Sequence, residues 1–389
     1  MYNIHSHYEN IYYYAKLHFK NPTVKYLFPF GSSDIAHVEI LRTGDGPGPV
    51  LFCYDQEPLI YHYNRYLLSD IQLKSQFDIA PFQKAPHDSN KANSFDIIFL
   101  NTEKDSLEKE KILKEYRFID CYYFYHALAA SDWYRGYKYD FRIQPIKQRK
   151  FDKKFISFNR ITGNSRVYRS LFVAELMRRN ILNHGLLSYS KTCPVHGSLK
   201  NNFVYAKDTY KLSGDYVSES YKLLEYHLET DLRIDGSIHE QIQNDSFAVG
   251  PVTNLMSSFL HVVTETCFWD TKKHLTEKIF KPIVLKQPFV LLGSQNNLSY
   301  LKEYGFKTFD KWWNEDYDKC SDPIQRINKV CDIIENICSL SQSDLQDLAL
   351  EMEETLEYNY NRFFSKTFVQ DVWTELLTNL DSAFSQFEY

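Results

Sequence analysis

Short apolar runs alternate with amphipathic stretches along most of this chain. Runs rich in β-branched and aromatic residues, bounded by turn-forming residues, predict strands within 24–31, 37–42, 50–58, 95–103, 155–160, 185–190, 258–266 and 288–293. Apolar residues at helical spacing predict helices within 8–19, 105–116, 166–181, 323–364 and 368–384. Strands that alternate with helices are typical of α/β folds built on parallel sheets.

The pattern is interrupted once and then restarts. Residues 139–154 are polar, basic and contain proline, so they are a candidate linker. A chain of 389 residues is also long for a single core. We therefore predict Rossmann-like domains over 1–150 and 151–364, and a C-terminal helix over 365–389 that can pack back on the first domain. Two such domains facing a central cleft would bind ligands beyond the carboxyl ends of their strands.

Composition narrows the functional classes. The net charge of −5 argues against a broad basic surface for nucleic acid. No apolar run has the length of a membrane span, and the N-terminus lacks the pattern of a secretory signal. The seven cysteines are scattered, and Cys193 and His196 have no second ligand pair nearby. We expect a cytoplasmic protein with free thiols and without a metal site.

The segment "LTEKIFKPIVLKQPFVLLGS" places opposite charges together at a predicted helix start. Thr276 is a plausible N-cap, and Glu277 and Lys278 would occupy the first turn. A lysine there suits a diphosphate, while a carboxylate accepts hydrogen bonds from ribose hydroxyls. The alternative is that Glu277 only complements the helix dipole and Lys278 is solvated. Pro282 should shorten or kink the helix.

The same segment, together with the preceding "VVTET", resembles a motif of the family-10 α-1,3-fucosyltransferases, which are glycosyltransferases of the GT-B class. The resemblance implies that Glu277 binds the donor ribose and Lys278 the diphosphate. It also assigns Glu265 and Thr276 to the donor-binding motif. His274 occupies the position of a family tyrosine that lies near the guanine base.

A second match covers "KKFISFNRITGNSRVYRSLFVAEL". It resembles the family's strand, polar turn and arginine-containing helix. Arg169 fits the diphosphate-binding arginine best, and Arg166, one turn earlier, is the rival. The planar guanidinium group suits two phosphate oxygens. The simpler interpretation is that both are solvated helix arginines.

The third match lies at the predicted strand "VLFCYDQEP". The family has a glutamate at the corresponding strand end, proposed as the general base, and Glu57 takes that position with Asp55 as the close alternative. Inverting sugar transfer needs a carboxylate that takes the proton of the acceptor hydroxyl. Both residues could instead cap the next helix. Farther along, Trp133, Tyr134 and Tyr137 fit either the core or an acceptor groove.

Together these features predict a GT-B glycosyltransferase, inverting and without a metal or other cofactor. It would move a sugar from a nucleoside-diphosphate donor, with a GDP-sugar favoured, to a glycan hydroxyl. One alternative is sugar transfer to a modified nucleic-acid base. Another is a non-catalytic protein of the same fold that binds nucleotides or glycans.

Overall fold

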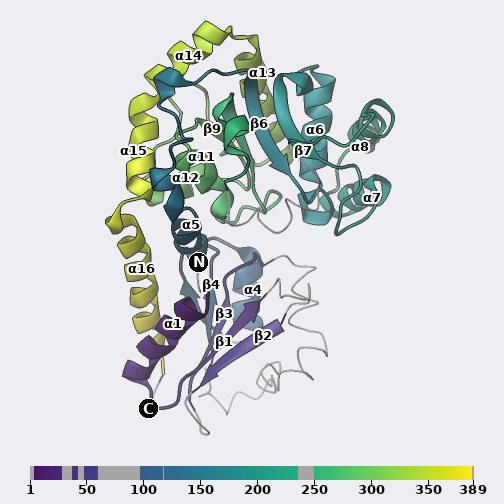
Figure 1. Ribbon diagram of the computed structural model, residues 1–389. Helices are drawn as coiled ribbons and strands as arrows, with labels where there is room; N and C mark the ends of the chain where they lie inside the picture. The colour runs from purple at the N-terminus through teal and green to yellow at the C-terminus, as the bar shows by residue number, and fades with distance from the viewer. Residues whose placement is uncertain are drawn as a thin grey trace. The chain divides into compact units, whose positions relative to one another are not determined.

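The computed structural model describes residues 4–28, 37–42, 48–59, 97–116, 118–234 and 249–387 (Figure 1). Both of its sheets are built mainly from parallel strands and are accompanied by many helices, so the chain is an α/β protein compatible with a Rossmann-like fold. It divides into two compact units, 1–132 with 369–389, and 133–368. Residues 133–150, predicted to belong to the first domain, therefore group with the second unit.

The first unit contains a five-stranded sheet in the order β2-β1-β3-β4-β5. Its strands are β1 (Thr23–Phe28), β2 (His37–Arg42), β3 (Val50–Tyr54), β4 (Ile97–Asn101) and β5 (Ile119–Tyr122). All neighbours are parallel except β1 and β2, which pair antiparallel. The chain between these two strands is too short for a crossover helix, and an antiparallel pair needs none.

Among the described residues, the helices that accompany this sheet are α1 (Ile4–His18), α4 (Leu107–Tyr116), α5 (Tyr125–Trp133) and α16 (Lys366–Phe384). The ends of the chain meet here, since α16 lies beside α1 (Figure 1). Tyr14 donates a 2.6 Å hydrogen bond to Asp381, and the amide of Asn379 donates to the carbonyl of Tyr122. The C-terminal helix thus belongs to the first unit.

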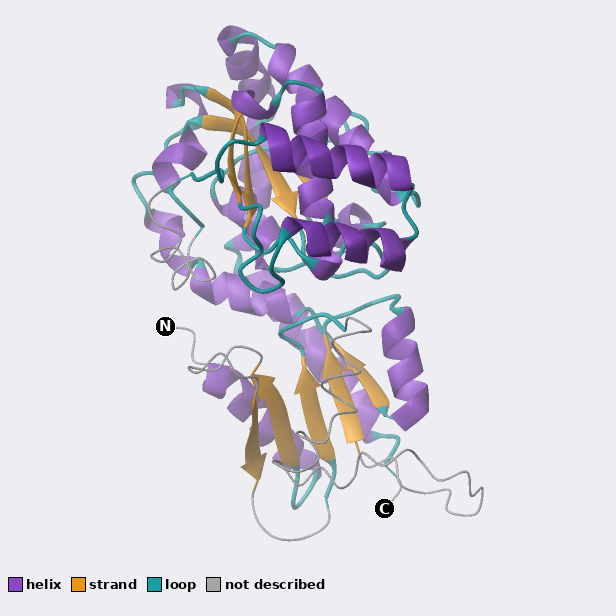
Figure 2. Cartoon of the chain, turned by 90° about the vertical axis from the view of Figure 1, so that its right-hand side faces the viewer, coloured by secondary structure: helices purple, strands orange, loops and turns teal. Residues whose placement is uncertain are grey.

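The second unit contains a four-stranded sheet in the order β7-β6-β8-β9, and all its pairs are parallel. The strands are β6 (Lys153–Asn159), β7 (Gly185–Tyr189), β8 (Ser258–Thr264) and β9 (Phe289–Leu292). Every residue of β8 is buried, as expected for a central parallel strand covered on both faces. Figure 2 shows helices packed around this sheet.

The helices of the second unit are α6 (Tyr168–Arg178), α7 (Leu199–Tyr210), α8 (Gly214–Lys222), α10 (Val252–Met256), α11 (Phe280–Val284), α12 (Asn297–Glu303), α13 (Pro323–Ser339), α14 (Gln342–Glu351) and α15 (Glu353–Phe363). The helices predicted from periodicity are present. In contrast, α7 was not predicted, because residues 191–250 show no clear periodic pattern. Among the described residues, no helix is long and apolar enough to cross a bilayer.

Candidate functional site

Glu265 is the buried centre of the predicted donor-binding motif. It follows β8 at the carboxyl edge of the second sheet and is 0% exposed. One carboxylate oxygen accepts the main-chain N–H of Thr276 at 3.1 Å, and the other accepts the Thr276 hydroxyl at 2.7 Å and the Thr266 N–H at 3.1 Å. Burial raises the pKa of Glu265, while the positive charge of Lys278 and the Thr276 hydrogen bonds oppose that rise.

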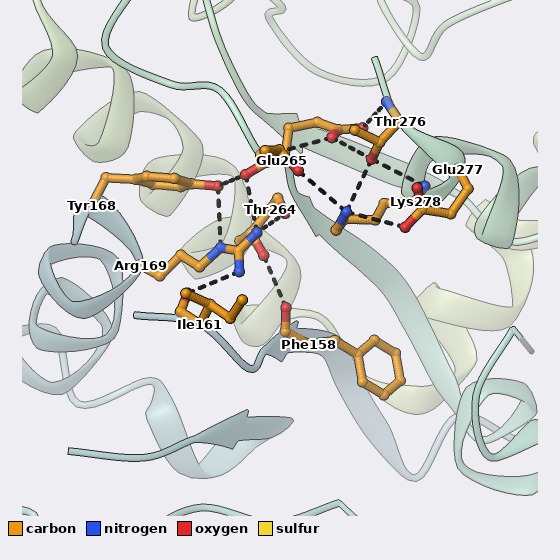
Figure 3. A network of polar contacts seen from close by, with 10 residues as sticks. Phe158, Ile161, Tyr168, Arg169, Thr264, Glu265, Thr276, Glu277 and Lys278 are labelled. Carbon is orange, nitrogen blue, oxygen red and sulfur yellow. Dashed lines mark hydrogen bonds and ion pairs between the residues drawn. The ribbon is translucent and has the colours of Figure 1, made fainter. Parts of the chain in front are cut away.

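The turn that begins at Thr276 presents two charged side chains. The Thr276 hydroxyl accepts the N–H of Lys278, which makes Thr276 the N-cap that the sequence predicted. The Lys278 ammonium group donates to Thr276 at 3.1 Å, to Thr266 at 3.4 Å and to the Glu277 carboxylate at 3.1 Å (Figure 3). The side chains of Glu277 and Lys278 are 14% and 31% exposed. The Glu277–Lys278 ion pair is therefore partly exposed to solvent, and the turn that carries it is held by the buried carboxylate of Glu265.

The helix behind this turn is short, as Pro282 predicted. A 3₁₀ turn over Glu277–Ile279 passes into α11, which ends at Val284. A proline removes one main-chain donor and crowds the preceding turn. Such a short helix has little macrodipole, so the positive charge that this turn can offer a ligand is the Lys278 ammonium group.

Arg169 is a main-chain clamp in this structure. It is 4% exposed, and its guanidinium group donates to the carbonyls of Ile161 at 2.9 Å, Thr264 at 2.9 Å and Glu265 at 3.0 Å. It also donates to the Tyr168 hydroxyl at 3.4 Å, and that hydroxyl donates to the Glu265 carbonyl. Figure 3 shows the guanidinium group directed at these carbonyls. Arg169 thus ties the loop after β6 to the end of β8, beneath the charged turn.

The other two predicted donor-binding residues differ in exposure. Arg166 ends a 3₁₀ turn over Asn164–Arg166 and is half-buried. Its charge, after burial, lowers the pKa of the neighbouring His196. His274 is fully buried, so its ring offers no open face on which a nucleobase could stack.

The loop that carries His274 is fastened to the strand end beside it. The His274 N–H donates to the side chain of Asn297 at 2.9 Å, and the amide of Asn297 donates to the Ser294 carbonyl at 2.9 Å. Gly293, directly after β9, leaves room for Glu265, because a Cβ atom there would lie 3.3 Å from that side chain's Cβ. The glycine that ends the apolar strand therefore allows close packing against the Glu265 side chain.

Aromatic contacts also hold the loop between β8 and Thr276 in place. Phe268 stacks on Tyr168 with ring centroids 4.2 Å apart, and Trp269 stacks on Tyr210 at 3.8 Å. The Trp269 indole N–H donates to the carbonyl of Ser165 at 2.8 Å. Sequence reasoning missed Tyr168, Thr266 and Asn297 as parts of this scaffold. Only Thr266 gave a signal, since it lies in the matched "VTET" element.

In the first unit, Asp55 follows β3 and is buried in a cage of phenols. It is 1% exposed, one oxygen accepts the Tyr8 hydroxyl at 2.6 Å, and the other accepts the Tyr123 hydroxyl. His7 lies 2.8 Å from the Tyr123 oxygen, and because that phenol donates to Asp55, the His7 ring must donate to it. Burial raises the pKa of Asp55 to about 6, against the lowering effect of the two phenols.

Glu57 lies two residues farther on and is half-buried. Both oxygens of Asp55 are already used by internal donors, which leaves Glu57 as the more accessible of the two predicted carboxylates. Neither residue caps a helix within the described range 48–59.

Opposite pH responses are expected from His7 and Asp55. Burial lowers the pKa of His7 from 6.5 to about 3, so its contribution to stability is lost as the pH falls below 6.5. The raised pKa of Asp55 adds stability as the pH falls from 6 towards 3.8. In Asp55→Asn only the effect of His7 remains, so the unfolding free energy of this variant should fall by about 2 kcal/mol when the pH is lowered from 6 to 4.5. In His7→Gln only the effect of Asp55 remains, so its unfolding free energy should rise by about 1.5 kcal/mol over the same range.

Urea unfolding at several pH values would measure this difference, with the wild type as the reference for all other titrating groups. The two effects nearly cancel in the wild type. If the two variants showed parallel pH profiles, the buried network would not be the source of the pH dependence.

No protein-family model and no curated protein matches this sequence. A function has to be inferred from the residues of the chain itself. The described part of the chain also contains no group of three or more His, Cys, Asp or Glu side chains placed to hold a metal ion.

Proposed function

We propose that this protein is a glycosyltransferase that takes a sugar from a nucleoside-diphosphate donor, in the manner of GT-B enzymes. The ammonium group of Lys278 would neutralise the diphosphate, and the carboxylate of Glu277 would accept hydrogen bonds from the ribose. The reaction would be inverting and metal-independent, with a glycan hydroxyl as acceptor and a GDP-sugar as the favoured donor. The seven free cysteines suit the cytoplasm.

The observation that supports this proposal most directly is the partly exposed Glu277–Lys278 pair on its buried support. Glu265 fixes Thr276 through two hydrogen bonds and also accepts the Thr266 N–H, and Thr276 in turn bonds the Lys278 ammonium group. Buried scaffolds of this kind hold charged groups in one geometry, which reduces the ordering cost of binding a ligand. The pair lies at the carboxyl edge of a parallel sheet, where α/β folds bind ligands.

The first unit supplies a candidate base. Glu57 follows β3 at the carboxyl edge of its own parallel sheet and is half-buried. As an inverting transfer begins, a carboxylate takes the proton of the acceptor hydroxyl while that oxygen attacks the anomeric carbon. The leaving nucleoside diphosphate gains negative charge, which Lys278 would stabilise.

Replacing Lys278 by alanine tests the donor site. We expect the affinity for a nucleoside diphosphate to fall by roughly 1.5–3 kcal/mol, the range of hydrogen bonds to charged groups. The nucleoside without phosphates should bind almost as before. A thermal-shift screen with GDP, UDP, CMP and dTDP sugars would select the nucleotide, and calorimetry would measure its affinity.

Lys286→Ala is a matched control, because Lys286 forms a comparable ion pair with Glu357 at 2.6 Å elsewhere in the second unit. It should leave nucleotide affinity unchanged. Equal affinity of Lys278→Ala and the wild type would place the donor site elsewhere. Tight binding without any sugar transfer or hydrolysis would favour a non-catalytic binding protein.

A further inference from the structure

Tyr134 carries a buried hydroxyl group that is not hydrogen-bonded by any of the described residues. Tyr134 comes directly after α5 in the sequence, belongs to the second unit and is 0% exposed. Its hydroxyl has no hydrogen-bond partner in the described part of the chain. The neighbouring Tyr137 differs, since its hydroxyl accepts the main-chain N–H of Val249 at 3.3 Å. An isolated buried hydroxyl costs about 1–3 kcal/mol and calls for an explanation.

The surroundings of this hydroxyl are acidic. After burial, the carboxylate of Glu277 is the largest cause that raises the pKa of Tyr134, and Tyr137 and Glu265 add to it. The phenol therefore stays protonated and is available as a donor. The carboxylate of Glu265 is occupied by Thr276 and Thr266, whereas Glu277 belongs to the partly exposed turn.

An unbonded phenol hydroxyl beside a carboxylate indicates what kind of ligand group would bond to Tyr134. A phosphate oxygen only accepts hydrogen bonds, so it could accept from the phenol but could not donate to the Glu277 carboxylate. A sugar hydroxyl both accepts and donates, so one such group can accept from the phenol of Tyr134 and donate to the carboxylate of Glu277. The Tyr134 hydroxyl would then gain a hydrogen-bond partner when a polyhydroxylated ligand is bound.

We propose that Tyr134 is a sugar-recognition residue whose hydroxyl donates to a hydroxyl group of the nucleotide sugar beside Glu277. This inference rests on the proposed function, because it needs the donor to bind at the Glu277–Lys278 pair. It adds a neutral donor to that site and places a sugar hydroxyl between the phenol and the carboxylate.

Tyr134→Phe removes only the oxygen atom and gives two readouts of opposite sign. The affinity for the nucleotide sugar should fall about five- to twenty-fold, the loss of one hydrogen bond to a partner that then stays unsatisfied. The melting temperature without ligand should rise by about 2 °C, because an unbonded polar group has left the core. Calorimetry and differential scanning calorimetry measure the two effects.

Tyr137→Phe is the matched control from the same segment. It should lower the melting temperature, since the Val249 N–H loses its acceptor, and leave affinity unchanged. A loss of affinity by Tyr134→Phe that appears already with the nucleoside diphosphate assigns the contact to the ribose. A loss seen only with the nucleotide sugar assigns it to the transferred sugar. Both results support the proposal.

Two results would overturn it. Unchanged affinity of Tyr134→Phe with a lowered melting temperature, or a complete failure of this variant to fold, would make the hydroxyl a structural group. If the wild type itself bound neither the nucleoside diphosphate nor the nucleotide sugar, the proposed function would fail first and the role of Tyr134 with it. Comparison of wild type and variant separates the two failures.

Discussion

Glu57→Gln is expected to lower turnover by ~10²–10⁴-fold, the usual contribution of a general base. Glutamine keeps the size of the side chain and its ability to hydrogen-bond, but it cannot take the proton of an acceptor hydroxyl. Donor affinity should stay nearly unchanged, because Glu277 and Lys278 belong to the second unit. Steady-state kinetics with saturating donor, together with calorimetry of donor binding, would measure both quantities.

Asp55→Asn is the control for this experiment. Asp55 is 1% exposed and both its oxygens accept phenol hydrogen bonds, so we expect its replacement to act on stability more than on turnover. Turnover should be measured well below the melting temperature of each variant. Normal turnover of Glu57→Gln with loss in Asp55→Asn would make Asp55 the base. Full activity of both variants would remove the first unit from the proposed chemistry.

The order of strands and helices was predictable because burial leaves a direct trace in the sequence. The run "FLHVVT" is apolar almost throughout, and the structure places it in β8, whose every residue is buried. Thr276 was predicted as an N-cap from local chemistry alone, and its hydroxyl does accept the N–H of Lys278. Features set by neighbours in the chain were therefore accessible without a structure.

Features set by distant partners were not accessible. Nothing near Arg169 in the sequence indicates that it meets the carbonyls of Thr264 and Glu265, which lie about a quarter of the chain away. The cage around Asp55 likewise joins α1, β3 and the residue after β5, so it forms only when the sheet is assembled. Whether a charged residue binds a ligand or a carbonyl depends on such long-range contacts.

Arg169 offers the sharpest test of this distinction, because resemblance and geometry assign it different roles. The resemblance implies contact with a diphosphate, whereas the structure commits its guanidinium group to three main-chain carbonyls. Arg169→Met keeps the aliphatic stem but removes the guanidinium donors of those carbonyls, of which that of Glu265 keeps another donor, the Tyr168 hydroxyl. We expect the unfolding free energy to fall by roughly 3–5 kcal/mol, because several buried carbonyls lose a charged donor at about 1–3 kcal/mol each.

Urea unfolding would measure that loss, and Arg166→Met is the matched control. Arg166 is half-buried and lies one turn away, so its replacement should cost less than about 1 kcal/mol. Diphosphate affinity of both variants, measured at low temperature where each is folded, then separates the roles. A clamp predicts that Arg169→Met is unstable and that Glu277 and Lys278 lose alignment, so affinity and stability fall together. A ligand-binding arginine predicts near-normal stability with a specific loss of affinity. That outcome would mean that the guanidinium group leaves its carbonyls when the diphosphate binds, and it would restore the role that the resemblance implies.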